Sequence, residues 1–215
     1  MEINGVHIVV DTGPDFRHQM LRERIRKLDA VLFTHAHKDH TAGLDDIRSF
    51  NFLQKKDMPV YGRPEVLEQL RREFAYIFTE KNYPGVPKVA LNPLDGQPFQ
   101  VEDQTITPVE VMHYRLPVYG FRFNDFTYIT DANSISTEEK EKIKGSKVIV
   151  LNALQKEEHI SHFTLDQALK LMEELQPEKG YLTHIGHNMG LHAAVSKELP
   201  DFVEIAWDGL QLTID

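Results

Sequence analysis

Short apolar runs alternate along the chain with stretches in which apolar positions recur at helical spacing. Residues 6–10 form a β-rich run after an Asn4-Gly5 turn signal, which predicts the second strand of a hairpin whose first strand is absent. Apolar residues at helical spacing predict a helix over residues 15–28, with Asp15 as its cap. Residues 30–34 then predict a buried strand.

The rest of the chain continues this mixture of helices and strands. Helices are expected at residues 44–54, 64–78, 164–176 and 191–199, with Pro64 in a first turn and a capping box at Thr164 and Gln167. Residues 82–98 hold four prolines and two glycines and are expected to be mostly loop. Extended segments are expected at residues 59–61, 99–101, 105–112, 119–123, 126–130, 147–151, 180–183, 203–206 and 210–214.

This mixture of elements predicts an α/β fold of two sheets packed face to face with helices outside, an αββα sandwich. A chain of 215 residues with 41% hydrophobic content fits one domain over residues 1–215. No apolar run approaches the roughly 20 residues that span a bilayer, and the first residues do not form a signal peptide. We therefore expect a cytoplasmic protein with no membrane partner.

Net charge and cysteine content limit the partners and the kinds of active site that the protein can have. The net charge of −9 disfavours long nucleic acid as a partner and makes a small substrate easier to accommodate. The chain has no cysteine, so disulfides, thiolate zinc sites and a cysteine nucleophile are all excluded. Any metal site must be built from histidine and carboxylate, which are natural ligands of zinc, manganese and iron.

One segment is dense in such ligands. His35, His37, Asp39 and His40 fall within six residues, directly after the buried strand. His35 and His37 are two residues apart on an extended segment and can point to the same side, while Asp39 and His40 can turn towards a second ion. A single histidine here would be an ordinary loop residue, but three histidines and an aspartate at this spacing indicate a metal site.

This segment resembles the HxHxDH signature of the metallo-β-lactamase superfamily, and the resemblance continues in family order at His113, Asp131 and His184. It implies two divalent ions, most readily zinc or manganese, with iron as an alternative. By this resemblance His35, His37 and His113 hold one ion, Asp39, His40 and His184 hold the other, and Asp131 bridges them. Two ions roughly 3.5–4 Å apart can hold a hydroxide nucleophile and stabilise the attacked anionic group.

Within the superfamily, the chain is similar to the phosphodiesterase branch that contains phosphoribosyl cyclic phosphate phosphodiesterase and the tRNA 3′-processing ribonucleases. The resemblance implies a phosphodiesterase that acts on a small (cyclic) phosphodiester. His162, 22 residues before His184, matches the family histidine that contacts the phosphate or protonates the leaving oxygen, and His159 is its competitor. We therefore expect catalytic roles for His162, Asp39 and Asp131.

Four further residues have weaker assignments. The resemblance implies that Asp11 orients a ligand histidine, although a simple turn aspartate is an equal alternative. His187 could reach the substrate or lie on the surface. Arg115 could bind a second anionic group or be merely exposed, and His159 could lie in a solvated loop.

Other functions remain open at this stage. A tRNA-processing endoribonuclease would share every ligand, but no Gly- and Lys-rich RNA-clamping arm lies between His113 and His184. A glyoxalase-type thioesterase would carry a helical substrate domain after His184. A redox protein or a non-catalytic metal-binding module is a further alternative. Relatives also begin with an additional strand, and the sheet edge exposed without it could be covered by a second copy in a homodimer.

Overall fold

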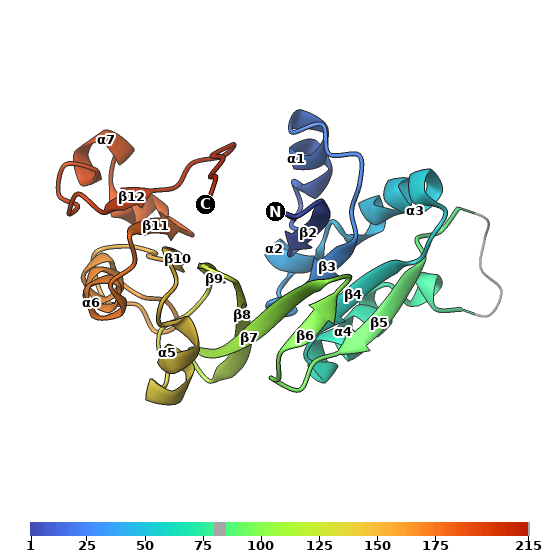
Figure 1. Cartoon of the computed structure of the whole chain (residues 1–215), viewed down its shortest axis with the longest axis horizontal. Helices are drawn as coiled ribbons and strands as arrows, with labels where there is room; N and C mark the ends of the chain where they lie inside the picture. Colours follow the sequence, from blue (N-terminus) through green and yellow to red (C-terminus); the bar gives the residue numbers. More distant parts are fainter. Residues whose placement is uncertain (80–84, 215) are drawn as a thin grey trace. The chain divides into compact units, whose positions relative to one another are not determined.

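A computed structural model describes residues 1–79 and 85–214. The chain forms two compact units, Met1–Gln104 and Thr105–Asp215. Each unit has its own sheet, its own helices and its own buried apolar cluster (Figure 1). The mixture of strands and helices expected from the sequence is present in both.

The first unit is built on a mostly parallel sheet in the order β1-β2-β3-β4-β5. Its strands are β1 (Glu2–Ile3), β2 (Val6–Val10), β3 (Ala30–Leu32), β4 (Met58–Gly62) and β5 (Val89–Pro93), and β6 (Phe99–Val101) follows near the end of the unit. Its helices are α1 (Phe16–Arg22), α2 (Lys38–Thr41), α3 (Arg48–Gln54) and α4 (Pro64–Glu73), with short 3₁₀ turns η1 (Leu44–Ile47) and η2 (Ala75–Ile77). Helix α4 lies against β4 and β5.

The N-terminal hairpin corrects one prediction. Strand β1 pairs antiparallel with β2, so the first strand of the hairpin is present as two residues. The turn between them has Asn4 at φ 50° and Gly5 at φ 80°. Both values suit the two-residue turn that joins twisted antiparallel strands, and asparagine and glycine adopt them at low cost.

Helix α1 is shorter than the periodicity predicts. It ends at Arg22, where Arg24 adopts φ 54° and the Ile25 and Arg24 amides donate to the Met20 and Leu21 carbonyls. This pair of hydrogen bonds is the Schellman arrangement that closes a helix. Leu28 is nevertheless fully buried, because the chain after the helix turns back into the core. The apolar residue at position 28 therefore reflects burial of the chain after the helix, and not a continuation of the helix.

The first unit buries its apolar residues around β3 and β4. Val31 and Phe33 are fully inaccessible, as is Val60 on the neighbouring strand. A parallel strand covered on both faces has an almost continuous apolar sequence, which explains the run Ala30 to Phe33. The strand that delivers the histidine segment is therefore anchored in the core.

The second unit contains a mixed sheet in which the strands lie in the order β12-β11-β10-β9-β8-β7. These strands are β7 (Gln104–His113), β8 (Leu116–Phe123), β9 (Phe126–Ile129), β10 (Val148–Asn152), β11 (Lys179–Thr183) and β12 (Val203–Ile205). Strands β7, β8 and β9 form the predicted antiparallel meander, and β9 to β12 are parallel. The helical elements are α5 (Thr137–Ile143), α6 (Leu165–Leu175), η3 (His187–Met189) and α7 (His192–Val195).

Helix α6 is confirmed and α5 was missed. The predicted capping box is formed at α6, with the Thr164 side chain accepting from the Gln167 amide and the Gln167 side chain accepting from the Thr164 amide. At α5 the Ser136 hydroxyl accepts from the Glu139 amide. Only Ile143 of that helix is buried, so it has no apolar stripe to reveal it, and the Ser136-to-Glu139 spacing was its available signal.

Three other segments differ from the predictions. Strand β5 lies within the expected loop of residues 82–98, of which residues 82–84 fall outside the described residues. Its proline, Pro93, is the last residue of an edge strand, where a missing amide costs little. Residues 210–214 form no strand, because their apolar alternation has no neighbouring strand to pair with. The helix expected at residues 191–199 is reduced to α7, which buries only Val195.

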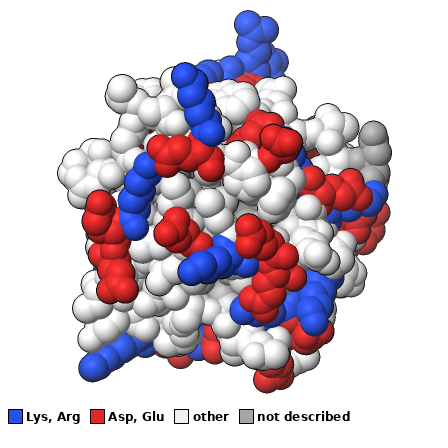
Figure 2. All heavy atoms as spheres, turned by 90° about the vertical axis from the view of Figure 1, so that its left-hand side faces the viewer, with Lys and Arg blue, Asp and Glu red and all other residues white. Residues whose placement is uncertain are grey.

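Charged side chains of both signs are interspersed on the face drawn in Figure 2. The second unit contains ion pairs such as Lys140 with Glu174 and Lys179 with Glu204. Single exposed ion pairs contribute about 1 kcal/mol or less to stability. In residues 1–79 and 85–214, no helix has the length and apolar content needed to cross a membrane.

Candidate metal centre

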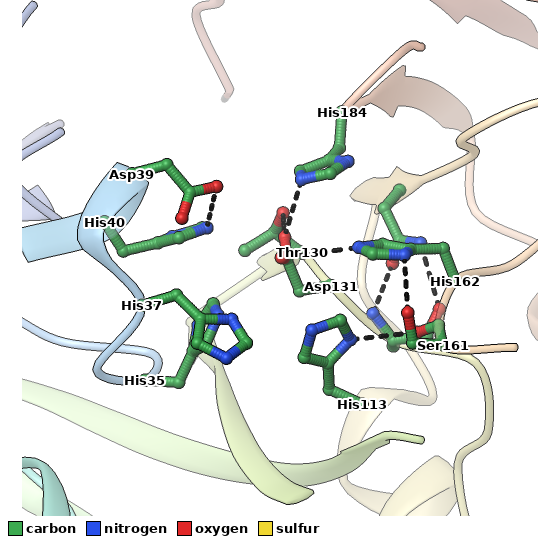
Figure 3. A network of polar contacts seen from close by, with 12 residues as sticks. His35, His37, Asp39, His40, His113, Thr130, Asp131, Ser161, His162 and His184 are labelled. Carbon is green, nitrogen blue, oxygen red and sulfur yellow. Dashed lines mark hydrogen bonds and ion pairs between the residues drawn. The ribbon is translucent and has the colours of Figure 1, made fainter. Parts of the chain in front are cut away.

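The first unit presents four ligand-type residues where β3 leaves the core. His35 is fully buried, His37 and Asp39 are exposed, and His40 is buried on the short helix α2. We call His35, His37, Asp39 and His40 the N-terminal ligand group. His35 Nε2 lies 2.9 Å from His37 Nδ1, and His40 Nε2 lies 3.5 Å from an Asp39 carboxylate oxygen (Figure 3).

Asp11 orients two histidines of this group. Its Oδ2 lies 2.7 Å from His40 Nδ1 and 2.8 Å from the Thr34 hydroxyl, which in turn lies 3.0 Å from His35 Nδ1. The Thr34 amide donates to Asp11 Oδ1. Burial raises the pKa of the Asp11 carboxyl, while the hydrogen bonds and charge of His40 and the hydrogen bonds of Thr34 act in the opposite direction.

Close backbone packing holds this segment in place. The Thr12 amide donates to the His40 carbonyl and the Gly43 amide donates to the Thr12 carbonyl. A Cβ atom at Gly13 would lie 2.6 Å from the Asp39 carbonyl oxygen, and one at Gly43 would lie 2.4 Å from the Gly13 carbonyl oxygen. Both glycines are therefore required for the turn after β2 to contact the helix that carries His40.

The second unit presents three ligand-type residues at strand ends. His113 ends β7, Asp131 follows β9 and His184 follows β11. We call them the C-terminal ligand group. Asp131 and His184 adopt positive φ of 55° and 56°, a conformation that L-residues adopt only at a cost. Backbone strain of this kind is concentrated at functional sites, where the surrounding structure maintains it.

Asp131 is the centre of this group. It is 2% exposed, and its Oδ1 lies 3.3 Å from His184 Nε2 and accepts the Thr130 hydroxyl at 2.6 Å. Its Oδ2 lies 3.4 Å from His162 Nε2 (Figure 3). His113, Asp131 and His162 each offer one ligand atom within 4.8 Å of the others.

His162 and His159 lie together on the loop before α6. His162 is buried and His159 is exposed. His162 Nδ1 lies 3.0 Å from the Ser161 hydroxyl and 3.1 Å from His159 Nδ1. Partial desolvation by neighbouring atoms, followed by the charges of His162 and His184, lowers the pKa of His159. His162 thus faces Asp131 through Nε2 and His159 through Nδ1.

Two sequence candidates lie outside these contacts. Arg115 follows His113 in the turn between β7 and β8, with its guanidinium over the ring of Tyr114. His187 is exposed at the start of η3.

The polar residues that hold the candidate ligands were not predicted from the sequence. Thr34 and Thr130 hydrogen-bond to His35 and Asp131, and the Ser161 carbonyl lies 3.0 Å from His113 Nδ1. Asn152 is fully buried and pairs through both amide atoms with the backbone of Ala132. Thr34 and Thr130 directly precede His35 and Asp131, and Ser161 directly precedes His162. Their position next to a candidate site residue was the available signal.

The donor chemistry of both groups fits a divalent cation. Nδ1 of His35, His40 and His113 is held by a hydroxyl, a carboxylate and a carbonyl oxygen, respectively. An Nδ1–H that donates to oxygen makes Nε2 the deprotonated nitrogen of the ring, which is the usual arrangement around metal-binding histidines. Three histidines with this same arrangement indicate metal ligation.

Comparison with known proteins identifies the family. A family model described as the Beta-lactamase superfamily domain matches residues 7–185, and the chain belongs to this family. The match extends across both units. The expected metallo-β-lactamase fold class is confirmed.

Individual relatives carry different names. A crystal structure of a new diphosphatase from the PhnP family is 33% identical, with a TM-score of 0.91, and the match covers 100% of this chain and 82% of that one. An octanoyltransferase of Porphyromonas gingivalis is 37% identical over 98% of this chain and 43% of its own length. A ribonuclease Z of Bradyrhizobium diazoefficiens is 31% identical over 57% of this chain and 42% of its own length.

The chain therefore spans less than half the length of these two curated relatives. The name octanoyltransferase describes a protein of which more than half lies outside the match. The names diphosphatase and ribonuclease Z both describe hydrolysis at phosphorus, in agreement with the hydrolase expected from the sequence.

Proposed function

We propose that this chain is a metal-dependent hydrolase that cleaves a small phosphodiester with the help of two divalent ions. The observation that carries the proposal is the common arrangement of His35, His40 and His113, each with Nδ1 held by an oxygen atom. All seven ligand-type residues implied by the family resemblance are present in the sequence. Zinc and manganese suit these nitrogen and carboxylate donors, and iron is an alternative.

When bound, such ions supply Lewis acidity and lower the pKa of a bound water towards neutrality. The chain's own residues supply orientation. Asp11 holds His40 directly and His35 through Thr34, so one buried carboxylate sets the orientation of two ligands. Asp131 divides its two carboxylate oxygens between His184 and His162, so both histidines hold the carboxylate in place.

His162 supplies a proton in this proposal. Its Nδ1 is held by Ser161 and its Nε2 faces Asp131 at 3.4 Å, so the ring is fixed from both sides. A proton on Nε2 can be donated to the oxygen of a departing alcohol, which is the step that a poor leaving group needs. Because the site needs no side-chain nucleophile, the absence of cysteine is no obstacle.

The substrate we propose is small and anionic. Two ions with charge +2, balanced by Asp39, Asp131 and a hydroxide, would leave a site of net charge about +1. The interspersed charges of Figure 2 provide no continuous basic surface on that face for a nucleic acid backbone. A homodimer that covers a free sheet edge is compatible with this proposal.

A diphosphate is the second candidate substrate. The specific observation in its favour is the name of the diphosphatase relative, which is 33% identical over the whole of this chain. Phosphoanhydride and phosphodiester cleavage require the same ions and the same polarised phosphoryl group. They differ in the leaving group, because a phosphate departs without the proton that an alkoxide needs.

A parallel assay tests the proposal. Purified protein loaded with manganese or zinc would be given bis(p-nitrophenyl) phosphate, a cyclic ribose phosphate, a dinucleoside diphosphate, a thioester and a pre-tRNA. We expect turnover of the small phosphorus esters or of the diphosphate, with little on the thioester or the RNA. Thioester turnover exceeding all phosphorus substrates would overturn the proposal.

A further inference from the structure

The turn between β7 and β8 places an aromatic ring where turn geometry favours glycine. His113 pairs with Leu116, so Tyr114 and Arg115 form a two-residue hairpin loop. Tyr114 adopts φ 58°, and Arg115 is not among the residues with positive φ. A two-residue loop with positive φ only at its first position matches a type II′ turn, in which that position is normally glycine. A tyrosine there is strained.

This strained tyrosine is held beside the reactive groups of the second unit. The Tyr114 amide donates to Asn133 Oδ1 at 3.0 Å, and Asn133 Nδ2 donates to the Ile160 carbonyl at 2.9 Å. Ile160 lies between His159 and His162 in the loop that precedes α6. His113, directly before Tyr114, has its ring 4.7 Å from that of His162. The hairpin loop and the histidine loop are therefore fastened together.

Three side chains on these two loops, Tyr114, Arg115 and Ile160, are exposed. Tyr114 is 47% exposed and Ile160 is 65% exposed. The Arg115 guanidinium lies 5.1 Å from the centroid of the Tyr114 ring. Within the described part of the chain, Arg115 forms no ion pair with a carboxylate. An aromatic ring fixed by an arginine, beside an apolar side chain, offers a planar ligand a stacking surface and an anion a positive charge.

We infer that Tyr114, Arg115 and Ile160 bind the ring of an aromatic phosphate ester, and that the substrate class is a nucleoside phosphate. Tyr114 stacks on the base and Arg115 pairs with phosphate oxygen, while His162 lies behind them at the bond to be cleaved. This inference rests on the proposed function, whose substrate it specifies. The positive φ of Tyr114, next to His113 at the end of β7, agrees with a functional role, because backbone strain is concentrated at functional sites.

The test compares binding of AMP with binding of ribose 5-phosphate, two ligands that differ only in the base. Calorimetric titration of the full chain should give an affinity for AMP at least about fivefold higher, the ratio expected for one stacked base. Tyr114→Gly should remove this preference and Tyr114→Phe should keep it. Because glycine relieves the positive φ, Tyr114→Gly should also raise Tm by about 2–4 °C. Phe52→Ala, which removes an 83% exposed aromatic ring from α3, is the matched control and should leave the preference intact.

Equal affinity of the wild type for both ligands would overturn the inference, and so would an unchanged preference in Tyr114→Gly. Failure of the proposed function has a different signature. If AMP binds through Tyr114 but no phosphorus ester is hydrolysed with any metal, the nucleotide site stands and the hydrolase does not. If esters are hydrolysed but Tyr114→Gly treats 2′,3′-cyclic AMP like the wild type, the hydrolase stands and the site does not.

Discussion

The Nδ1 atom of His40 lies 2.7 Å from Oδ2 of Asp11, and both side chains are only 10% exposed. The same carboxylate oxygen accepts the Thr34 hydroxyl that contacts His35. Asp11, in the turn after β2, thus positions two histidines that follow the C-terminal end of β3. We expect the affinity of the site for metal to depend on this residue, although it does not itself ligate.

Asp11→Asn should therefore weaken metal binding without unfolding the protein. The amide keeps one oxygen but places a donor where a carboxylate accepted two hydrogen bonds, so His40 or Thr34 loses its partner. Loss of such a partner typically reduces metal affinity by about 10- to 100-fold. Competition with a chromophoric chelator measures the change. Asp15→Asn, at an exposed position near the start of α1, is the control, and equal affinity of both variants would exclude the positioning role.

Asn152 should be a stability determinant of the C-terminal ligand group. Ala132 directly follows Asp131. The fully buried side-chain amide of Asn152 donates to the Ala132 carbonyl at 2.9 Å and accepts from the Ala132 backbone amide at 2.8 Å. Asn152→Ala leaves two buried backbone groups without partners, at about 1–3 kcal/mol each. Chemical denaturation should show a loss of about 2–6 kcal/mol. A loss below about 0.5 kcal/mol would contradict this role, since that is the range of ordinary surface substitutions.

The Asp29 carboxylate should make a pH-dependent contribution to the stability of the folded protein. Burial raises the pKa of its carboxyl, but hydrogen bonds from the His7 amide, Lys27 and Lys56 outweigh burial, so the pKa lies below its usual value. A lowered pKa in the folded state stabilises the protein above the unfolded pKa of about 3.9, and this contribution is lost as the pH falls through the folded value. Asp29→Asn should cost about 1–3 kcal/mol at pH 7.

Urea denaturation at several pH values measures this difference. The gap between the wild type and Asp29→Asn should shrink as the pH falls below about 4. Asp15→Asn should show no comparable gap at any pH. A gap for Asp29→Asn that is constant down to pH 3 would show that the residue acts by packing and not through its charge.

His162 should show a leaving-group signature. If it donates a proton to the departing oxygen, His162→Ala should lower turnover of alkyl phosphodiesters by about 10²- to 10⁴-fold. A p-nitrophenolate group leaves without protonation, so turnover of p-nitrophenyl substrates should fall much less. Metal content should be unchanged. Equal losses on both substrates would instead assign His162 to phosphate binding, and His159→Ala in the same pair of assays decides between the two histidines.

Much of the fold could be predicted because burial and periodicity coincide in most of its elements. The anchored strand β3, the meander of β7 to β9 and the capped helix α6 all follow from local sequence. Prediction failed where tertiary contacts decide. Leu28 is apolar because the chain folds back after α1, and β5 forms beside β4 in a proline-rich segment whose composition indicates a loop.

The candidate ligand residues could be predicted from the sequence because metal chemistry restricts residue type and spacing. Their supports could not, because a threonine or asparagine that holds a ligand has no distinctive spacing. Asn152 is 21 residues from Asp131 and meets its neighbour Ala132 only because β9 and β10 pair in parallel. Similarly, the strain at Tyr114 depends on the register of the β7–β8 hairpin, which fixes the loop at two residues.

Activity as a function of bound metal tests the central claim most directly. Protein stripped of metal would be titrated with Mn²⁺ while hydrolysis of bis(p-nitrophenyl) phosphate and metal content are both followed, with Asp131→Ala alongside. The seven-ligand set predicts that activity rises to a plateau at about two ions per chain in the wild type, and that Asp131→Ala fails to reach it. A wild-type plateau at one ion per chain, or no hydrolysis at any metal content in folded protein, would contradict a two-metal phosphoesterase.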